Sequence, residues 1–348
     1  MSALPNGVER VRVETERIET HYLESGDEDG EPVVFLHGNA SSSRFYGELL
    51  AALPDRYRGL APDFRGFGRS ERRPIDATRG LRDFADDIKA FTSALGIETA
   101  AVGGWSTGGG VAMRYAIENT DRVDSLFLIN PVSPYGFGGT RRDGTPCQPD
   151  YAGTGGGLAN DEFVELLAAG DATAESEASP RNVLRSFYTA PGTELDSELE
   201  DAYVNAILET ETGEGYYPGD AIESQHWPNV APGESGVNNA LSPKYCDLTE
   251  LVDIDPKPPV LWIRGAEDMI VSDESFFDAG YLGQLGEIPG WPGEAEFPPQ
   301  PMVTQTRDVL AEYEDSGGTF SEEVVEETGH SPHIENQAEV LDLLLGHL

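Results

Sequence analysis

The chain has 348 residues, of which 63 are acidic and 23 are basic, and its formal net charge is −40. At about 150 residues per domain, this length corresponds to two units or to one large domain with an insertion. DNA, RNA and anionic membranes are polyanions that such a chain would repel, and no basic run provides a local exception. We therefore expect no nucleic-acid or membrane partner.

The large excess of carboxylates is typical of salt-adapted proteins. Self-repulsion destabilises a compact acidic chain at low ionic strength. In molar salt the Debye length falls to about 3 Å, so the repulsion is largely screened. We interpret the composition as that of a salt-adapted intracellular protein that resembles those of haloarchaea.

The sequence shows no feature that is typical of targeting to another compartment. Its first 22 residues are polar and lack the apolar region of a signal peptide. No apolar run approaches the roughly 20 residues that a membrane-spanning helix needs. We predict a cytoplasmic protein in which Cys147 and Cys246 are free thiols, because a reducing compartment disfavours disulfides.

Short β-rich runs alternate with helical stretches along most of the chain. The predicted strands are Val11–Glu14, Glu19–Glu24, Val33–Leu36, Tyr57–Ala61, Thr99–Gly103, Ser125–Ile129, Val260–Arg264 and Phe320–Glu326. An apolar stripe with a 3.6-residue period predicts an amphipathic helix over Leu81–Leu95, which Gly96 ends. Continuous apolar strands and intervening helices predict an α/β fold with a mostly parallel central sheet flanked by helices.

The alternation fails between the sixth and seventh predicted strands, where Gly, Pro, Tyr and acidic residues dominate. Here we predict helices over Asp161–Ala169 and Ser197–Glu209 and no clear buried strand. We interpret residues 1–131 and 258–348 as the core and residues 132–257 as a mainly helical or irregular cap. A second insertion, residues 281–303, contains Trp291 and is expected to lie near the cap.

The strongest chemical signal is the run Gly104-Trp105-Ser106-Thr107-Gly108, which follows a predicted strand and precedes a helical pattern. In this strand–turn–helix context, G-x-S-x-G is typical of a nucleophile elbow, where a strained turn exposes the serine. Glycines two residues before and after the serine allow the close approach that the turn requires. We predict Ser106 as the nucleophile.

A serine hydroxyl needs a base, and the base needs an acid that orients it. His330 lies in a loop after the last predicted strand and is the predicted base, with His333 as its rival. Asp268 follows the penultimate strand and is the predicted acid, with Glu267 as the fallback. The other strand end at which such an acid could stand carries Asn130.

Attack on an acyl carbon creates an oxyanion that preorganised N–H groups stabilise. We predict that the backbone amides of Asn39 and Thr107 form this oxyanion hole, because Asn39 follows a buried strand and Thr107 follows the nucleophile. His37 is expected to hold the Asn39 loop. No H-E-x-x-H motif or Cys/His cluster indicates a metal, and no G-x-G-x-x-G or P-loop motif indicates a nucleotide cofactor.

Together these motifs resemble the α/β-hydrolase superfamily. The resemblance covers His37-Gly38-Asn39, the D-x-R-G-x-G-x-S stretch at residues 63–70, the elbow, and Gly329-His330, in a core of roughly 11–130 and 259–348. It implies that the cap is inserted after the sixth strand. It also implies structural roles for Asp63 and Arg65 in their loop.

The Asn39 loop and the 63–70 stretch also resemble those of haloalkane dehalogenases and epoxide hydrolases. Those relatives use an aspartate nucleophile, whereas this chain has Ser106 at that position. A dehalogenase forms an alkyl ester on its carboxylate, which a hydroxyl cannot replace. Both activities are therefore disfavoured.

The first hypothesis is a serine hydrolase that cleaves a carboxylic ester, lactone or thioester of a small, largely apolar substrate through an acyl-enzyme, without cofactor or metal. The alternatives are a C–C bond hydrolase or cofactor-free perhydrolase on the same triad, and a small-molecule binding protein without catalysis. Trp105, Trp227 and Tyr135 are the candidate substrate contacts. The sequence predicts no oligomeric state.

Overall fold

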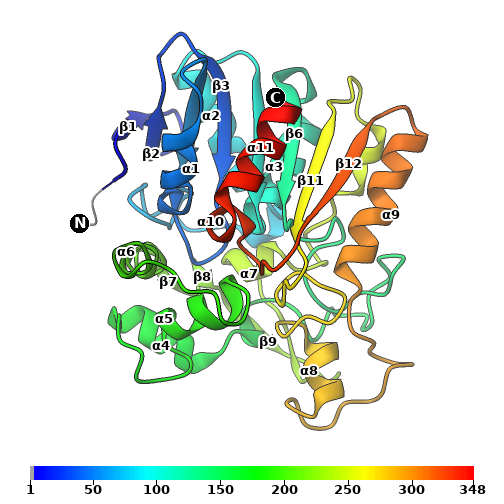
Figure 1. The fold of residues 1–348 in the computed structure, drawn as a ribbon. Coiled ribbons are helices and arrows are strands. Elements are labelled where there is room, and N and C mark those ends of the chain that lie inside the picture. The colour runs from blue at the N-terminus through cyan, green and yellow to red at the C-terminus, as the bar shows by residue number, and fades with distance from the viewer. Residues whose placement is uncertain (1–3) are drawn as a thin grey trace.

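An eight-stranded sheet forms the centre of the molecule in the computed structural model, which describes residues 4–348 (Figure 1). The strand order is β1-β2-β4-β3-β5-β6-β11-β12. These strands are β1 (Val8–Glu14), β2 (Glu19–Ser25), β3 (Glu31–Leu36), β4 (Tyr57–Pro62), β5 (Ala100–Trp105), β6 (Val123–Ile129), β11 (Val260–Gly265) and β12 (Phe320–Val325). Strand β2 runs antiparallel to both of its neighbours, and the other neighbouring pairs are parallel.

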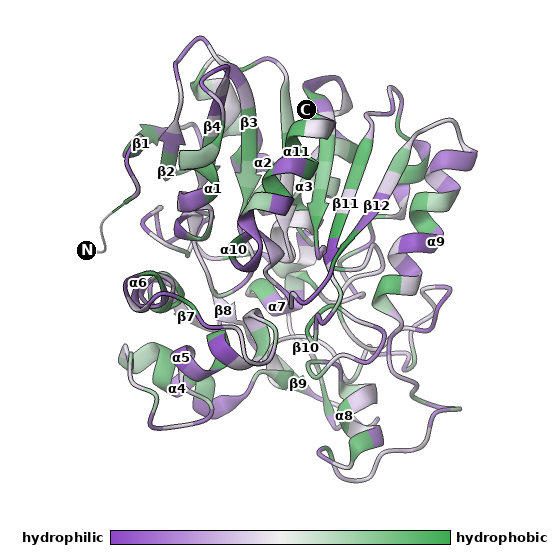
Figure 2. Cartoon of the chain, viewed as in Figure 1, coloured by the Kyte–Doolittle hydropathy of each residue, from purple (hydrophilic) through white to green (hydrophobic). Residues whose placement is uncertain are grey.

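Each strand predicted from the sequence is present, and the mostly parallel α/β sheet is confirmed. The largest difference in bounds is at β1, which begins at Val8 rather than Val11. Strands β3 and β6 are nearly inaccessible to solvent along Val33–Leu36 and Leu126–Ile129. Their side chains are buried on both faces, as the continuous apolar runs predicted. Figure 2 shows the hydrophobic residues concentrated along these central strands.

Helices cover both faces of the sheet. The core helices are α1 (Gly47–Ala52), α2 (Arg82–Ala94), α3 (Thr107–Glu118), α9 (Met302–Asp315), α10 (Pro332–Glu335) and α11 (Gln337–His347). Helices α1 and α11 contact each other in front of the sheet in Figure 1, whereas α2 and α3 contact each other behind it. Helix α2 is one residue shorter at each end than predicted, and Gly96 beyond it has a φ of +70°.

Residues 132–257, which lie between β6 and β11 in the chain, are called the inserted segment below. It lies below the sheet in Figure 1. It contains the helices α4 (Asp161–Ala169), α5 (Pro180–Val183), α6 (Ser197–Leu208) and α7 (Val237–Ala240), and the strands β7 (Thr212–Gly213), β8 (Tyr217–Pro218), β9 (Ala221–Glu223) and β10 (Val230–Pro232).

The inserted segment agrees with the sequence in its helices and differs in its strands. Helix α4 has the predicted bounds, because the Asn160 side chain accepts a hydrogen bond from Phe163 N and Gly170 ends the helix at a φ of +70°. The expectation of no buried strand was wrong at β8 and β10, where Tyr217 and Ala231 are buried. Strands of two or three residues are too short to show an alternating pattern in the sequence.

The second insertion contacts the inserted segment. It begins within α8 (Ala279–Leu285) and continues as a Pro- and Gly-rich stretch that leads to α9. The Trp227 and Phe297 rings meet edge to face with centroids 4.9 Å apart, and Trp227 Nε1 donates to Pro289 O at 2.9 Å. Cys147 and Cys246 are free. None of the helices within residues 4–348 is long and apolar enough to cross a membrane.

Candidate active site

Ser106 lies at a sharp turn between β5 and α3. Its φ is 57° and its ψ is −121°, a backbone conformation that residues with side chains rarely adopt. A Cβ at Gly104 would lie 2.5 Å from the Gly108 backbone, and one at Gly108 would lie 2.0 Å from Leu36 O. The two glycines of the G-x-S-x-G motif are therefore required by the close approach of the backbone, and the turn presents Ser106 at the carboxyl end of the sheet.

His330 and Asp268 form a buried pair. His330 Nδ1 is 2.9 Å from Asp268 Oδ2, and both residues are at most 9% exposed. Asp268 Oδ1 accepts hydrogen bonds from Ile270 N (2.7 Å) and Val271 N (3.0 Å), which fix the carboxylate. An ionised carboxylate only accepts, so Nδ1 carries the proton and Nε2 is left with a lone pair.

Ser106 Oγ and His330 Nε2 are not joined by a hydrogen bond in the part of the chain that the structure describes. This contact is often long in proteins without substrate and shortens when substrate binds. The two residues are linked through Trp105, which precedes Ser106 and whose Nε1 donates to His330 O at 2.7 Å.

His333, the rival base, has a different environment. Its ring lies against Tyr46 and Trp105, with centroids 5.0 and 5.1 Å away. Among the described residues, neither ring nitrogen has a hydrogen-bond partner. Burial, together with the charge of nearby His330, lowers the pKa of His333 to about 3. A neutral imidazole that no carboxylate orients is a poor general base, so the geometry favours His330.

The predicted oxyanion-hole amides are available. Thr107 is the first residue of α3, where backbone N–H groups have no partner within the helix. Within residues 4–348, neither Thr107 N nor Asn39 N donates a hydrogen bond. Both amides therefore lack an acceptor among the described residues, as the amides of an oxyanion hole do before an oxyanion forms.

The Asn39 loop is held from the core and from the inserted segment. His37 is fully buried, and its Nε2 accepts a hydrogen bond from Phe64 N at 3.0 Å. Burial lowers the pKa of His37, which keeps it neutral in this structural role. From the inserted segment, Tyr188 Oη donates to Asn39 O (3.1 Å), and the Asn39 side-chain amide donates to Asn238 Oδ1 (2.8 Å).

Asn130 holds the His330 loop from the end of β6. Its Nδ2 donates to Gly329 O (3.1 Å) and His330 O (2.9 Å), and its Oδ1 accepts from Gly265 N (3.1 Å). Reasoning from the sequence considered this position only for an acid and missed the anchoring role. The φ of +39° that aims the side chain is decided by the tertiary structure.

The three candidate substrate contacts have different surroundings. Trp105 is 1% exposed, stacks on Phe45 and binds His330 O, so its substrate-binding role is corrected to one in the core. Trp227 packs against the second insertion, as described above. Tyr135 is half-buried against Gly144. The contacts of Trp227 and Tyr135 give no support to substrate binding.

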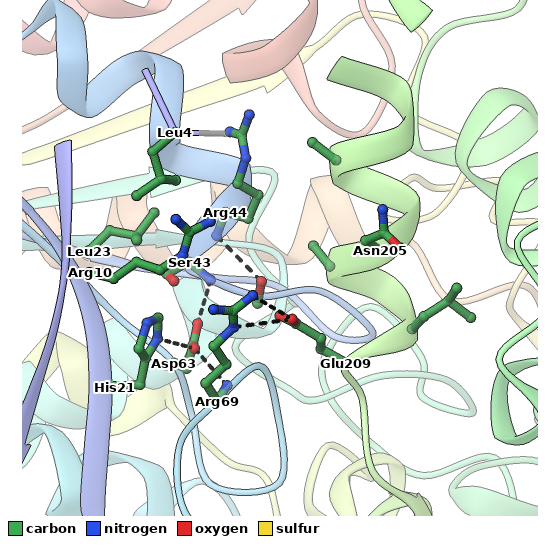
Figure 3. Close-up of a pocket in the computed structure, with 14 residues that line it drawn as sticks. Leu4, Arg10, His21, Leu23, Ser43, Arg44, Asp63, Arg69, Asn205 and Glu209 are labelled. Atoms are coloured by element: carbon green, nitrogen blue, oxygen red, sulfur yellow. Dashed lines mark hydrogen bonds and ion pairs between the residues drawn. The ribbon is translucent and has the colours of Figure 1, made fainter. Parts of the chain in front are cut away.

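Two hollows differ in their relation to the predicted site residues. One of about 330 Å³ is lined by Asp268 and by Pro191 of the inserted segment. The other, of about 270 Å³, lies between α6 and the first strands and contains none of the predicted site residues (Figure 3).

Figure 3 shows the charged groups of the second hollow directed at one another. His21 Nδ1 is 2.7 Å from Asp63 Oδ2, and Arg69 Nη2 is 3.0 Å from Glu209 Oε1. Although burial alone would raise it, the pKa of Asp63 is held below its usual range by hydrogen bonds from His21 and Ser43 N. We interpret this hollow as part of the structural interface between the core and α6.

Comparison with known protein families is consistent with this geometry. Residues 31–276 match the family described as alpha/beta hydrolase fold, which is more than two thirds of the chain. The chain belongs to the alpha/beta hydrolase family. Its relatives and structural neighbours include a haloalkane dehalogenase, an epoxide hydrolase and a carboxylesterase.

The curated relatives match only part of the chain. Haloalkane dehalogenase 2 of Mycobacterium tuberculosis is 37% identical over 110 residues, which are 32% of this chain and 37% of the dehalogenase. The soluble epoxide hydrolase of Corynebacterium sp. is 34% identical over 112 residues, 32% of this chain and 38% of that protein. The chain thus spans little more than a third of their length. Both are bacterial, and the expected likeness to haloarchaeal proteins rests on composition alone.

Solved structures match over nearly the whole chain. Carboxylesterase CesB from Bacillus subtilis has a TM-score of 0.60 at 18% identity, over 99% of this chain and 92% of that one. The enol-lactonase from Burkholderia xenovorans LB400 has a TM-score of 0.58 at 17% identity, over 97% of this chain and 99% of that one. At these identities the likeness shows the fold.

Proposed function

We propose that this protein is a hydrolase that cleaves a carboxylic ester, lactone or thioester of a small, largely apolar substrate through an acyl-enzyme. The observation that carries the proposal is the His330–Asp268 pair, at 2.9 Å, on the loop that Trp105 ties to the Ser106 turn. The backbone amides of Asn39 and Thr107, which have no acceptor among the described residues, would complete the set of groups that acyl transfer needs.

Each group has one task in the reaction. Ser106 Oγ attacks the acyl carbon while His330 Nε2 takes its proton, and the Asn39 and Thr107 amides donate to the oxyanion. The C–O or C–S bond to the leaving group breaks, and His330 returns the proton to that group. Water then attacks the acyl-enzyme with His330 again as base, which releases the acid and regenerates Ser106. Asp268 stabilises the imidazolium throughout.

Ser106 argues against the activities named for the two curated relatives. In our interpretation, dehalogenation and epoxide opening need a carboxylate that forms an alkyl ester at this position. A hydroxyl would form an ether, which water does not hydrolyse under these conditions. Acyl substrates would instead form an ester on Ser106, which water readily hydrolyses. The proposal is therefore limited to acyl substrates.

We further propose that residues 132–257 act as a cap over the core, with residues 281–303 as a secondary insertion beside it. Two contacts support this role, because Tyr188 and Asn238 of the inserted segment both bind the Asn39 loop. The cap would then set the position of one oxyanion donor as well as the size of the acyl pocket.

The test is hydrolysis of p-nitrophenyl esters of increasing acyl length in molar KCl, by wild type and Ser106→Ala. Removal of a triad serine costs on the order of 10⁶ in turnover. Activity that survives in Ser106→Ala would exclude the mechanism. Ser133→Ala, which removes a buried hydroxyl bound to Gln305, is the control and is expected to retain activity.

A fluorophosphonate probe separates the remaining alternatives when no ester is cleaved. Labelling of wild type but not of Ser106→Ala would indicate an activated serine with another substrate, as in a C–C bond hydrolase or a perhydrolase. A folded wild-type protein that is not labelled would indicate a binding protein on the same fold.

A further inference from the structure

The carboxylate of Glu335 lies between the His330 loop and the inserted segment. Glu335 ends α10, five residues after His330. Its Oε1 accepts a hydrogen bond from Gly329 N (2.9 Å). Its Oε2 accepts from Ala190 N (2.6 Å) and from Thr193 Oγ1 (3.0 Å). One side chain therefore binds the residue before the base and a part of the chain far away in sequence.

The two segments joined by Glu335 touch directly. A Cβ at Gly329 would lie 2.6 Å from Ala190 N and 2.7 Å from Thr189 C, so a residue with a side chain does not fit without displacing this backbone. On its other side, Gly329 O accepts from Asn130 Nδ2 at 3.1 Å. The backbone before His330 is thus held between Asn130 in the core and residues 189–190 of the inserted segment.

These contacts require two acceptor oxygens. Burial raises the pKa of Glu335, and the Ala190 and Gly329 amides oppose that shift by donating to the carboxylate. A glutamine of the same shape has one oxygen and one NH₂ group, so it would turn a donor toward either Gly329 N or the Ala190–Thr193 pair. An isosteric amide would therefore lose the contact with either Gly329 or the Ala190–Thr193 pair and keep the other contact.

We propose that Glu335 is a positioning residue that fixes the His330 loop against residues 189–193, so that the base is correctly placed only when the inserted segment is docked on the core. This inference rests on the proposed function, in which His330 is the base. Its consequence is that movement of the inserted segment and competence of the triad are coupled through one side chain.

The experiment compares Glu335→Gln with wild type by ester hydrolysis and by hydrogen exchange. We expect kcat to fall about 10- to 100-fold with KM changed less than about threefold, because a misplaced base affects the chemical step more than binding. We expect the peptide covering residues 326–334 to exchange at least about tenfold faster, since the Gly329 amide loses its acceptor or its anchor.

Two further variants provide controls. Glu339→Gln removes a carboxylate that binds the Asn336 side chain at the surface of α11, and it is expected to match wild type in both measurements. Thr193→Val removes one donor on the inserted segment and keeps the Ala190 amide. It is expected to reduce kcat less than Glu335→Gln does.

The outcomes separate this inference from the proposed function. Wild-type kcat and wild-type exchange in Glu335→Gln would overturn the positioning role, whatever the reaction. A loss of kcat that Glu339→Gln shows equally would assign the effect to charge rather than position and would also overturn it. If activity survives in Ser106→Ala, the proposed function fails, while the exchange measurement still tests the bridge.

Discussion

The core and the inserted segment differ in how they contribute to the active site. The core carries the three residues of the proposed triad, which follow strands of a sheet whose central strands are fully buried. The inserted segment carries none of them and reaches the site through hydrogen bonds at its rim. Tyr188 and Asn238 bind the Asn39 loop, and Ala190 binds Glu335 beside His330. In the proposed mechanism the core therefore supplies the reacting groups, and the inserted segment positions the loops that carry them.

Asp268→Asn tests the contribution of the core to catalysis and has the largest expected effect on kcat. The variant keeps the shape of the side chain but favours the wrong tautomer of His330, so kcat should fall about 10⁴-fold. Ester hydrolysis at saturating substrate measures it. Glu267→Gln, at the exposed neighbouring position, is the control. A similar loss of kcat in Glu267→Gln would contradict the assignment of Asp268 as the acid that orients His330.

Asp278→Asn tests how the inserted segment is joined to the second insertion. Asp278 is fully buried and accepts hydrogen bonds from Gly139 N and Gln300 N. Burial raises its pKa from 3.8 to about 6. In the folded state the carboxyl therefore stays protonated to a higher pH than in the unfolded state. The stability from this group is complete below about pH 4 and is lost as the pH rises through about 6.

The measurement is the free energy of unfolding by urea at several pH values in molar KCl. Between about pH 4 and about pH 6, wild type should lose on the order of 2–3 kcal/mol relative to Asp278→Asn, which cannot titrate. Equal pH slopes for the two proteins would contradict the buried ionisation. Asp273→Asn, a half-buried carboxylate near α9, is the control for removal of one negative charge.

Asn238→Ala has the smallest expected effect and tests the rim contact alone. It removes the acceptor for the Asn39 side-chain amide and leaves Ser106, His330 and Asp268 in place. A less firmly held oxyanion donor should reduce kcat by roughly tenfold, since removal of a complete donor costs about 10²–10³-fold. Unchanged kcat would confine the inserted segment to substrate selection. Asn205→Ala, on the exposed face of α6, is the control.

Periodicity and glycine placement were sufficient for much of the fold. The buried strands and the amphipathic α2 have strong local patterns, and α4 has a cap at each end, so their bounds were predicted to within a few residues. The elbow was predictable because its turn depends on Gly104 and Gly108 beside Ser106. The short strands of the inserted segment were missed because their order depends on contacts with distant segments rather than on a local repeat.

The sequence by itself determined which residues have the right chemistry, because Ser106, Asp268 and His330 follow strands whose carboxyl ends meet at one edge of a parallel sheet. Only the tertiary structure decided which histidine pairs with the acid and which one is buried without a partner. It also decided that Trp105 belongs to the core and that Asn130 and Glu335 hold the His330 loop. Those roles depend on hydrogen bonds between residues up to 225 positions apart, and such pairings leave no periodic pattern in the sequence.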